Sequence, residues 1–154
     1  MQEICAKAED LANAILRGAG FDLRASAKET DQGCLLSIDG ADNGLLLNQG
    51  GELLDALQQI LNQAVGRSLP KGQRIICDAD NYRAAREAEL RAMAHHAARQ
   101  VRSTGSSFVF GPMDGNERRV IHLTLADEPD LHTESIGEGN ARRLRVSPRA
   151  AAST

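Results

Sequence analysis

The chain lacks tryptophan and holds one tyrosine and three phenylalanines among its 154 residues. RNA-recognition sheets and oligonucleotide-binding barrels stack bases on rows of aromatic rings, which this sequence cannot supply. Any nucleic acid must therefore be held through its phosphates and backbone. An excess of positive charge is also missing, because 18 Lys and Arg stand against 21 Asp and Glu. The distribution of charge matters more than its total, and one cluster of arginines crowds the C-terminal part: Arg118, Arg119, Arg142, Arg143, Arg145 and Arg149.

Cysteines and long apolar runs are equally scarce. Cys5, Cys34 and Cys77 are far apart and form no C-x-x-C pair, which argues against a disulfide framework or a zinc site and predicts free, buried thiols. No apolar run approaches the roughly 18 residues of a membrane span, and Met1-Gln2-Glu3 places no basic region before an apolar stretch. We expect neither a membrane segment nor a signal peptide, and a cytoplasmic location.

Signatures of catalysis are absent as well. The sequence has no P-loop, G-x-S-x-G elbow, H-E-x-x-H helix or glycine-rich dinucleotide fingerprint. We therefore expect no enzymatic activity, no metal, no cofactor and no small-molecule substrate.

The periodicity of apolar residues predicts an α+β chain of two small domains, at residues 1–78 and 79–147, followed by a frayed tail at 148–154. The first domain is expected to hold a helix at 2–17, strands at 21–28 and 34–38, a helical turn at 42–47, a glycine loop at 48–51, a helix at 53–65 and a strand at 73–77. The second is expected to hold a helix at 81–103 capped by an aspartate of Asp78-Ala79-Asp80, a strand at 106–110, a helix at 115–126 and strands at 131–136 and 142–147.

Arg118 and His122 lie four residues apart on the predicted helix at 115–126, so both project from one face. Arginine supplies a permanently charged planar fork, and histidine adds a donor whose charge depends on pH. Together they suit a phosphate or sugar oxygen better than a base edge. The alternative is an ordinary solvated face, since arginine and histidine are often spaced in this way on helices.

Arg143 and Arg145 sit two apart on the last predicted strand and therefore share one face, opposite Leu144 and Val146. We expect them to extend the surface begun by Arg118 and His122, with Arg142 in the same cluster. An edge strand protected by arginines is the alternative. Arg119, a quarter-turn from Arg118, is expected at the rim or in a salt bridge. On the neighbouring strand, His132, Thr133 and Ser135 could donate to the same ligand or serve the structure alone.

The string Asp114-Gly115-Asn116-Glu117-Arg118-Arg119-Val120-Ile121-His122-Leu123 resembles the single-stranded-nucleic-acid-binding domain named for its Arg-x3-His signature. The segments Asp127-Glu128-Pro129, His132-Thr133-Glu134-Ser135, Gly137-Glu138-Gly139 and Arg142-Arg143 continue the resemblance. Upstream, Asp80-Asn81-Tyr82-Arg83 with Arg86 is similar to the first helix of this domain in the bacterial Jag family, also called KhpB or SpoIIIJ-associated. Residues 33–69, with Gly44-Leu45-Leu46-Leu47, Gly51-Glu52 and Leu54-Asp55-Ala56-Leu57-Gln58, are similar to the KH domain that precedes it there. The resemblance covers roughly residues 3–147, so we do not expect the additional N-terminal domain of many members.

The loop of the KH-like domain departs from the pattern of the family, which is G-x-x-G with a basic residue inside. Here the loop reads Asn48-Gln49-Gly50-Gly51, so the cation is lost. Asparagine tolerates positive φ, and we expect the left-handed turn to survive at Asn48. Losing a charge-assisted phosphate contact costs about 1 to 3 kcal/mol. We predict weak binding through the amides of Gly50 and Gly51; alternatively, the loop only connects two helices.

The resemblance implies an RNA-binding regulator or RNA chaperone linked to cell-envelope growth and cell shape, with a small KH-domain protein or a second copy as partner. From the residues we predict binding of single-stranded RNA or ssDNA without catalysis, at modest affinity that falls with salt. The alternative is a protein-interaction module that has lost nucleic-acid binding, which the altered loop and the negative net charge favour.

Overall fold

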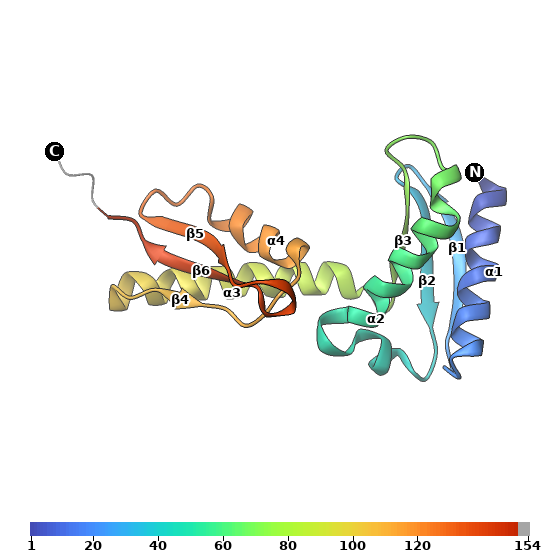
Figure 1. Cartoon of the computed structure of the whole chain (residues 1–154), viewed down its shortest axis with the longest axis horizontal. Helices are drawn as coiled ribbons and strands as arrows, with labels where there is room; N and C mark the ends of the chain where they lie inside the picture. Colours follow the sequence, from blue (N-terminus) through green and yellow to red (C-terminus); the bar gives the residue numbers. More distant parts are fainter. Residues whose placement is uncertain (151–154) are drawn as a thin grey trace. The chain divides into compact units, whose positions relative to one another are not determined.

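The computed structural model describes residues 1–150 and divides the chain into two compact units, Met1–Arg83 and Ala84–Thr154. Each unit combines helices with its own three-stranded sheet (Figure 1), which confirms the α+β fold. The boundary between the units falls inside helix α3 (Tyr82–Thr104), a few residues after the boundary predicted at residues 78–79. The difference arises because Tyr82 and Arg83, which open the helix, pack on the first unit.

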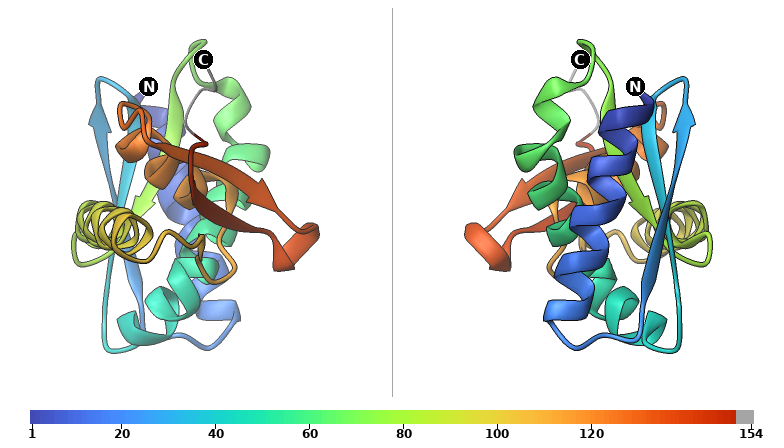
Figure 2. Two further views of the ribbon diagram at one scale, coloured as in Figure 1. Left: turned by 90° about the vertical axis from the view of Figure 1, so that its left-hand side faces the viewer. Right: turned by 90° about the vertical axis from the view of Figure 1, so that its right-hand side faces the viewer.

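The first unit places two helices on one face of a sheet (Figure 2). Its elements are α1 (Gln2–Gly18), β1 (Arg24–Thr30), β2 (Gly33–Asp39), α2 (Asn43–Ala64), a 3-10 turn η1 (Gly66–Ser68) and β3 (Arg74–Asp78). The strand order is β1-β2-β3, with β1 antiparallel and β3 parallel to β2. Alternate residues of β2 enter the core with α1 and α2, as the period of two requires: Cys34, Leu36 and Ile38.

The three cysteines are buried and free in this core, as predicted. Burial raises the pKa of the Cys34 and Cys77 thiols to about 12. They therefore behave as small apolar side chains of the packed interior.

The second unit packs α3 and α4 on one face of an antiparallel sheet. Its elements after α3 are β4 (Phe108–Val109), α4 (Gly115–Leu125), β5 (Leu131–Ile136), a 3-10 turn η2 (Gly139–Ala141) and β6 (Arg143–Pro148), with strand order β4-β6-β5. The core joins Leu90, Ala94, Ala97 and Val101 of α3 to Ile121 and Leu125 of α4 and to Leu144 and Val146 of β6. Helix α4 starts where the sequence predicts, because the Asp114 side chain accepts a hydrogen bond from the Glu117 amide at 2.9 Å.

Two expectations at the ends of elements need adjustment. The aspartate at the start of α3 is Asp78, whose side chain accepts from the Arg83 amide at 3.3 Å; Asp80 adopts a positive φ of 50°. The fraying predicted from residue 148 is wrong at its start, because Pro148 ends β6 opposite Leu131 and the Arg149 amide donates to the Asp130 carbonyl at 2.8 Å. The remainder of that tail, residues 151–154, lies outside the described residues. Within residues 1–150, no helix combines the length and apolarity needed to cross a membrane.

Candidate nucleic-acid interface

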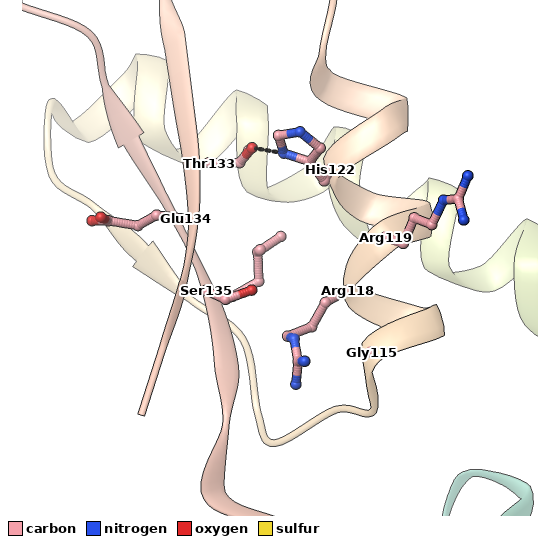
Figure 3. A pocket seen from close by; sticks show the side chains of 8 residues that line it. Gly115, Arg118, Arg119, His122, Thr133, Glu134 and Ser135 are labelled. Atoms are coloured by element: carbon pink, nitrogen blue, oxygen red, sulfur yellow. Dashed lines mark hydrogen bonds between the residues drawn. The ribbon is translucent and has the colours of Figure 1, made fainter. Parts of the chain in front are cut away.

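Arg118 and His122 project from one face of α4 toward strand β5 (Figure 3). The His122 ring is exposed, and its Nδ1 is hydrogen-bonded to the Thr133 hydroxyl. Arg118 is half-buried, and its Nη1 donates to the Met113 carbonyl at 2.8 Å. The α4 spacing therefore brings the two side chains together as predicted, and each is held by one neighbour. Within residues 1–150, the remaining donors of the guanidinium and the second ring nitrogen have no other hydrogen-bond partner.

These side chains border an open pocket of about 340 Å³. It is lined by Gly115, Arg118, Arg119, His122, Thr133, Glu134, Ser135 and Leu144. Two cations, an imidazole and two hydroxyls thus surround one space, and the first residue of α4 also borders it. Backbone amides at a helix start carry partial positive charge and favour anions. The arrangement is suited to a phosphate group.

Arg119 and Arg142 occupy the margins of this site. Arg119 is exposed and points away from Arg118 (Figure 3), so it sits at the rim as expected. The Arg119 side chain forms no hydrogen bond or ion pair with any residue in the described part of the chain. Arg142 is exposed, and its carbonyl accepts from the amide of Met113, the residue that anchors Arg118.

Arg143 and Arg145 do not extend the pocket surface, so that expectation is wrong. In the β5–β6 register, Arg145 lies opposite Glu134, and the alternate residues Leu144 and Val146 enter the core beneath the helices. Side chains alternate across a strand, so the two arginines emerge on the far side of the sheet from α4. They form a separate surface with Val109, His132 and Glu134, which we call the open face.

On the open face, Arg145 is paired with the carboxylate of Glu134. Arg145 donates through Nε to Glu134 Oε1 at 2.8 Å and through Nη2 to the same oxygen. These hydrogen bonds hold the pKa of Glu134 below its ordinary value. Arg143 donates to the Ala141 carbonyl at 3.4 Å.

A contact absent from the sequence-based interpretation holds α4 in place. Arg86 of α3 donates through Nε to Glu117 Oε1 at 2.8 Å, and both side chains are largely buried. This hydrogen bond raises the pKa of Arg86 further above its usual value. The pair fixes the first turn of α4, and with it Arg118, against α3. No short-range pattern could have revealed it, since the residues lie 31 positions apart.

The loop of the first unit interrupts α2 at Asn48–Gly51, where the sequence predicts a break. The predicted left-handed turn at Asn48 is wrong: Asn48 is extended, with φ −64° and ψ 157°, and positive φ begins at Gln49. The Asn48 side chain accepts from the Gln49 amide at 3.0 Å, which stabilises this placement.

Asn48, Gln49 and Gly50 are exposed, whereas Gly51 is buried against Tyr82; a Cβ on Gly51 would lie 2.7 Å from the Tyr82 ring. Residues 29–66 contain no Lys or Arg, so the loop and its flanking segments carry backbone amides but no cation of their own.

Comparisons with known proteins fit this geometry. Residues 88–148 match the model of the Arg-x3-His domain family. The chain is 32% identical over 126 residues to the RNA-binding protein KhpB of Clostridium symbiosum, covering 82% of this chain and 57% of that protein. It is 35% identical over 112 residues to the RNA-binding protein KhpB of Bacillus subtilis (strain 168), covering 71% and 54%.

A further relative is the RNA-binding protein KhpB of Lactiplantibacillus plantarum, 32% identical over 114 residues, with 74% of this chain and 35% of that protein covered. The chain therefore spans between about a third and just over half of the length of these relatives. The pocket lies within the matched segment, between a helix carrying Arg118 and His122 and the strand carrying Thr133. The C-terminal part of the chain, residues 88–148, is an Arg-x3-His domain.

Proposed function

We propose that this protein is a non-catalytic RNA-binding protein of the Jag/KhpB family, which holds single-stranded RNA or ssDNA by its phosphates in the pocket of the Arg-x3-His domain. One observation carries the proposal: Arg118, His122 and the hydroxyls of Thr133 and Ser135 converge on one open space beside the start of α4. Phosphate contacts position a strand without reading its sequence.

The first unit is proposed to be a KH-like domain with a weak ligand loop. Its order of helix, two strands, interrupted helix and strand is that expected for the KH domain of the family, with α2 serving as two helices around Asn48–Gly51. The Gln49 amide is bonded to the Asn48 side chain and Gly51 is buried, so the exposed residue Gly50 supplies the amide contact, and the missing cation limits its strength.

Pairing with a small KH-domain protein, or with a second copy, is proposed for the same unit. Three large apolar side chains of α2 are about half exposed, Leu45 at 52%, Leu53 at 45% and Ile60 at 47%. Exposed apolar groups of this kind favour a protein contact. In this proposal the protein regulates RNA in the cytoplasm as a chaperone, in processes linked to cell shape.

The test measures binding of a pool of single-stranded RNA at low and moderate salt. The double variant Arg118→Ala with His122→Ala should bind about tenfold more weakly than the wild type. His95→Ala with Arg99→Ala is the matched control, because it removes the same two residue types, also four apart, from the exposed face of α3. Gly50→Asp tests the loop and should have a smaller effect.

Equal binding by the pocket variant and its control would refute the role of the pocket. No binding by the wild type, together with a stable complex with a KH protein, would favour the protein-interaction module instead.

A further inference from the structure

The open face of the Arg-x3-His domain carries charged side chains that point away from the pocket. Val109 is 44% exposed there, and the side chains of Arg145 and His132 are 41% and 52% exposed. Arg143 lies two residues from Arg145 on the same side of β6. The face holds two guanidinium groups against the single carboxylate of Glu134, so it remains cationic even with that pair formed.

Glu134 is held between two basic groups. Its Oε1 accepts from Arg145, and its Oε2 lies 4.0 Å from the Nε2 of His132. All three side chains are substantially exposed, so the ion pair contributes little to folding. A pair that costs little to open leaves Arg145 available to a second anion.

Strand β5 connects the open face with the pocket. Thr133 and Ser135 line the pocket from one side of β5, while Glu134, between them, also borders the pocket and sends its carboxylate to the other side (Figure 3). Strand β5 is an outer strand of the sheet, and no side chain within residues 1–150 bonds its backbone. A polymer leaving the pocket over this edge crosses His132 and Glu134 of β5 and then reaches Arg145 on the neighbouring strand β6.

We propose that Arg145 is a second phosphate contact for the strand held in the pocket, and that Glu134 is a built-in competitor that occupies Arg145 until the strand crosses the β5 edge. This inference rests on the proposed function. A phosphodiester replaces the carboxylate on the same guanidinium, which binds both anions in similar geometry. Arg143 then supplies the following contact. Short anions that fill only the pocket do not reach Arg145, so the competitor makes binding depend on strand length.

The test compares a single-stranded oligouridylate of about 12 nucleotides with a dinucleotide, in a direct binding assay across a range of salt. Glu134→Gln should bind the long strand about threefold more tightly than the wild type. The slope of log Kd against log salt should steepen by about 0.7, the value for one more phosphate contact on a single strand. Binding of the dinucleotide should tighten less, because the dinucleotide occupies the pocket that Glu134 borders but does not reach Arg145.

Glu138→Gln is the matched control, because it removes the same charge from an exposed position on the β5–β6 connection. It should bind like the wild type. Arg145→Ala by itself should weaken binding of the long strand. In that background, Glu134→Gln should bring no more gain than it brings for the dinucleotide.

Three results would overturn the inference: a gain from Glu134→Gln that is no larger for the long strand than for the dinucleotide, an equal gain from Glu138→Gln, or a gain of the same size without Arg145. If any of these occurs while Arg118→Ala with His122→Ala still weakens binding, only the inference falls. Unchanged binding by that pocket variant would refute the proposed function itself.

Discussion

The two sheets of the molecule treat their outer strands differently. In the first unit, helix side chains bond the free edges of β1 and β3, whereas β5 of the Arg-x3-His domain receives no such bond within residues 1–150. The bonds in the first unit join Asn13 to Ala25, Glu9 to Ala27, Asn62 to Ile75 and Gln58 to Cys77. Unpaired strand edges are templates for further pairing, and these side chains close them. Side chains thus occupy backbone groups at both edges of the first sheet, while the second sheet keeps an accessible edge, strand β5, beside its cationic pocket.

The same contrast holds for the forces that join the elements. Side-chain amides bonded to backbone dominate in the first unit. In the second unit, guanidinium groups bonded to carboxylates join distant parts of the chain, as in Arg86 with Glu117 and Arg102 with Asp130. Such pairs are screened by salt where they are exposed, and neutral hydrogen bonds are not. The free energies of unfolding of the two units should therefore respond differently to salt and to the removal of charged side chains.

The largest effect, a loss of stability, is expected from Asn62→Ala in the first unit. Asn62 donates to the Ile75 carbonyl at 2.7 Å and accepts from the Ile75 amide at 2.9 Å. Removing the amide leaves both backbone groups without this partner, which should lower the free energy of unfolding by about 3 kcal/mol, with little dependence on salt. Denaturant unfolding followed by circular dichroism measures the loss. Gln63→Ala, one residue further along α2 and exposed, is the control. Equal stability of the two variants would show that water replaces the two hydrogen bonds of Asn62.

A smaller loss is expected from Glu117→Gln in the Arg-x3-His domain. The side chain of Glu117 is 13% exposed and that of Arg86 22%, so neutralising the carboxylate leaves a largely buried guanidinium with a weaker partner. We expect a loss of about 1 kcal/mol, measured by the same method. Glu87→Gln breaks the exposed pair with Arg91 and should be nearly silent. A loss as large in Glu87→Gln would contradict the role of burial.

The smallest effect concerns acid. Hydrogen bonds from Arg102 lower the pKa of Asp130 below its ordinary value. A carboxyl group whose pKa is lower in the folded state stabilises it above the unfolded pKa, and this contribution disappears as pH falls through the folded pKa. An NMR titration should show that Asp130 protonates at lower pH in the wild type than in Arg102→Gln, with Arg99→Gln as the control. Identical titration curves in all three proteins would mean that the ion pair does not persist in solution.

The sequence predicts the elements and the pocket pair well because both depend on local periodicity. Arg118 and His122 share a face for the same reason that Ile121 and Leu125 reach the core. The position of Arg143 and Arg145 depends on a second fact, namely which face of the sheet the helices cover. The signal was present: Leu144 and Val146 had to face α4, which sends the arginines away from it. Combining the two patterns would have separated the surfaces.

Contacts between distant residues were beyond the reach of such patterns. The Arg86–Glu117 pair depends on how α3 and α4 pack, and Glu117 by itself is typical of any first helical turn. The loop shows the same limit at short range. Asparagine can adopt positive φ but does not have to. The hydrogen bond from the Gln49 amide to the Asn48 side chain favours the extended conformation instead.

The packing of Tyr82 on Gly51 makes the glycine loop observable without a label. With no tryptophan and a single tyrosine in the chain, ultraviolet excitation near the tyrosine band addresses one ring, and that ring touches the loop. Its emission and anisotropy report the environment of residue 51, so titrations of unmodified protein can separate events at the loop from events at the imidazole and guanidinium of the other unit, which do not fluoresce.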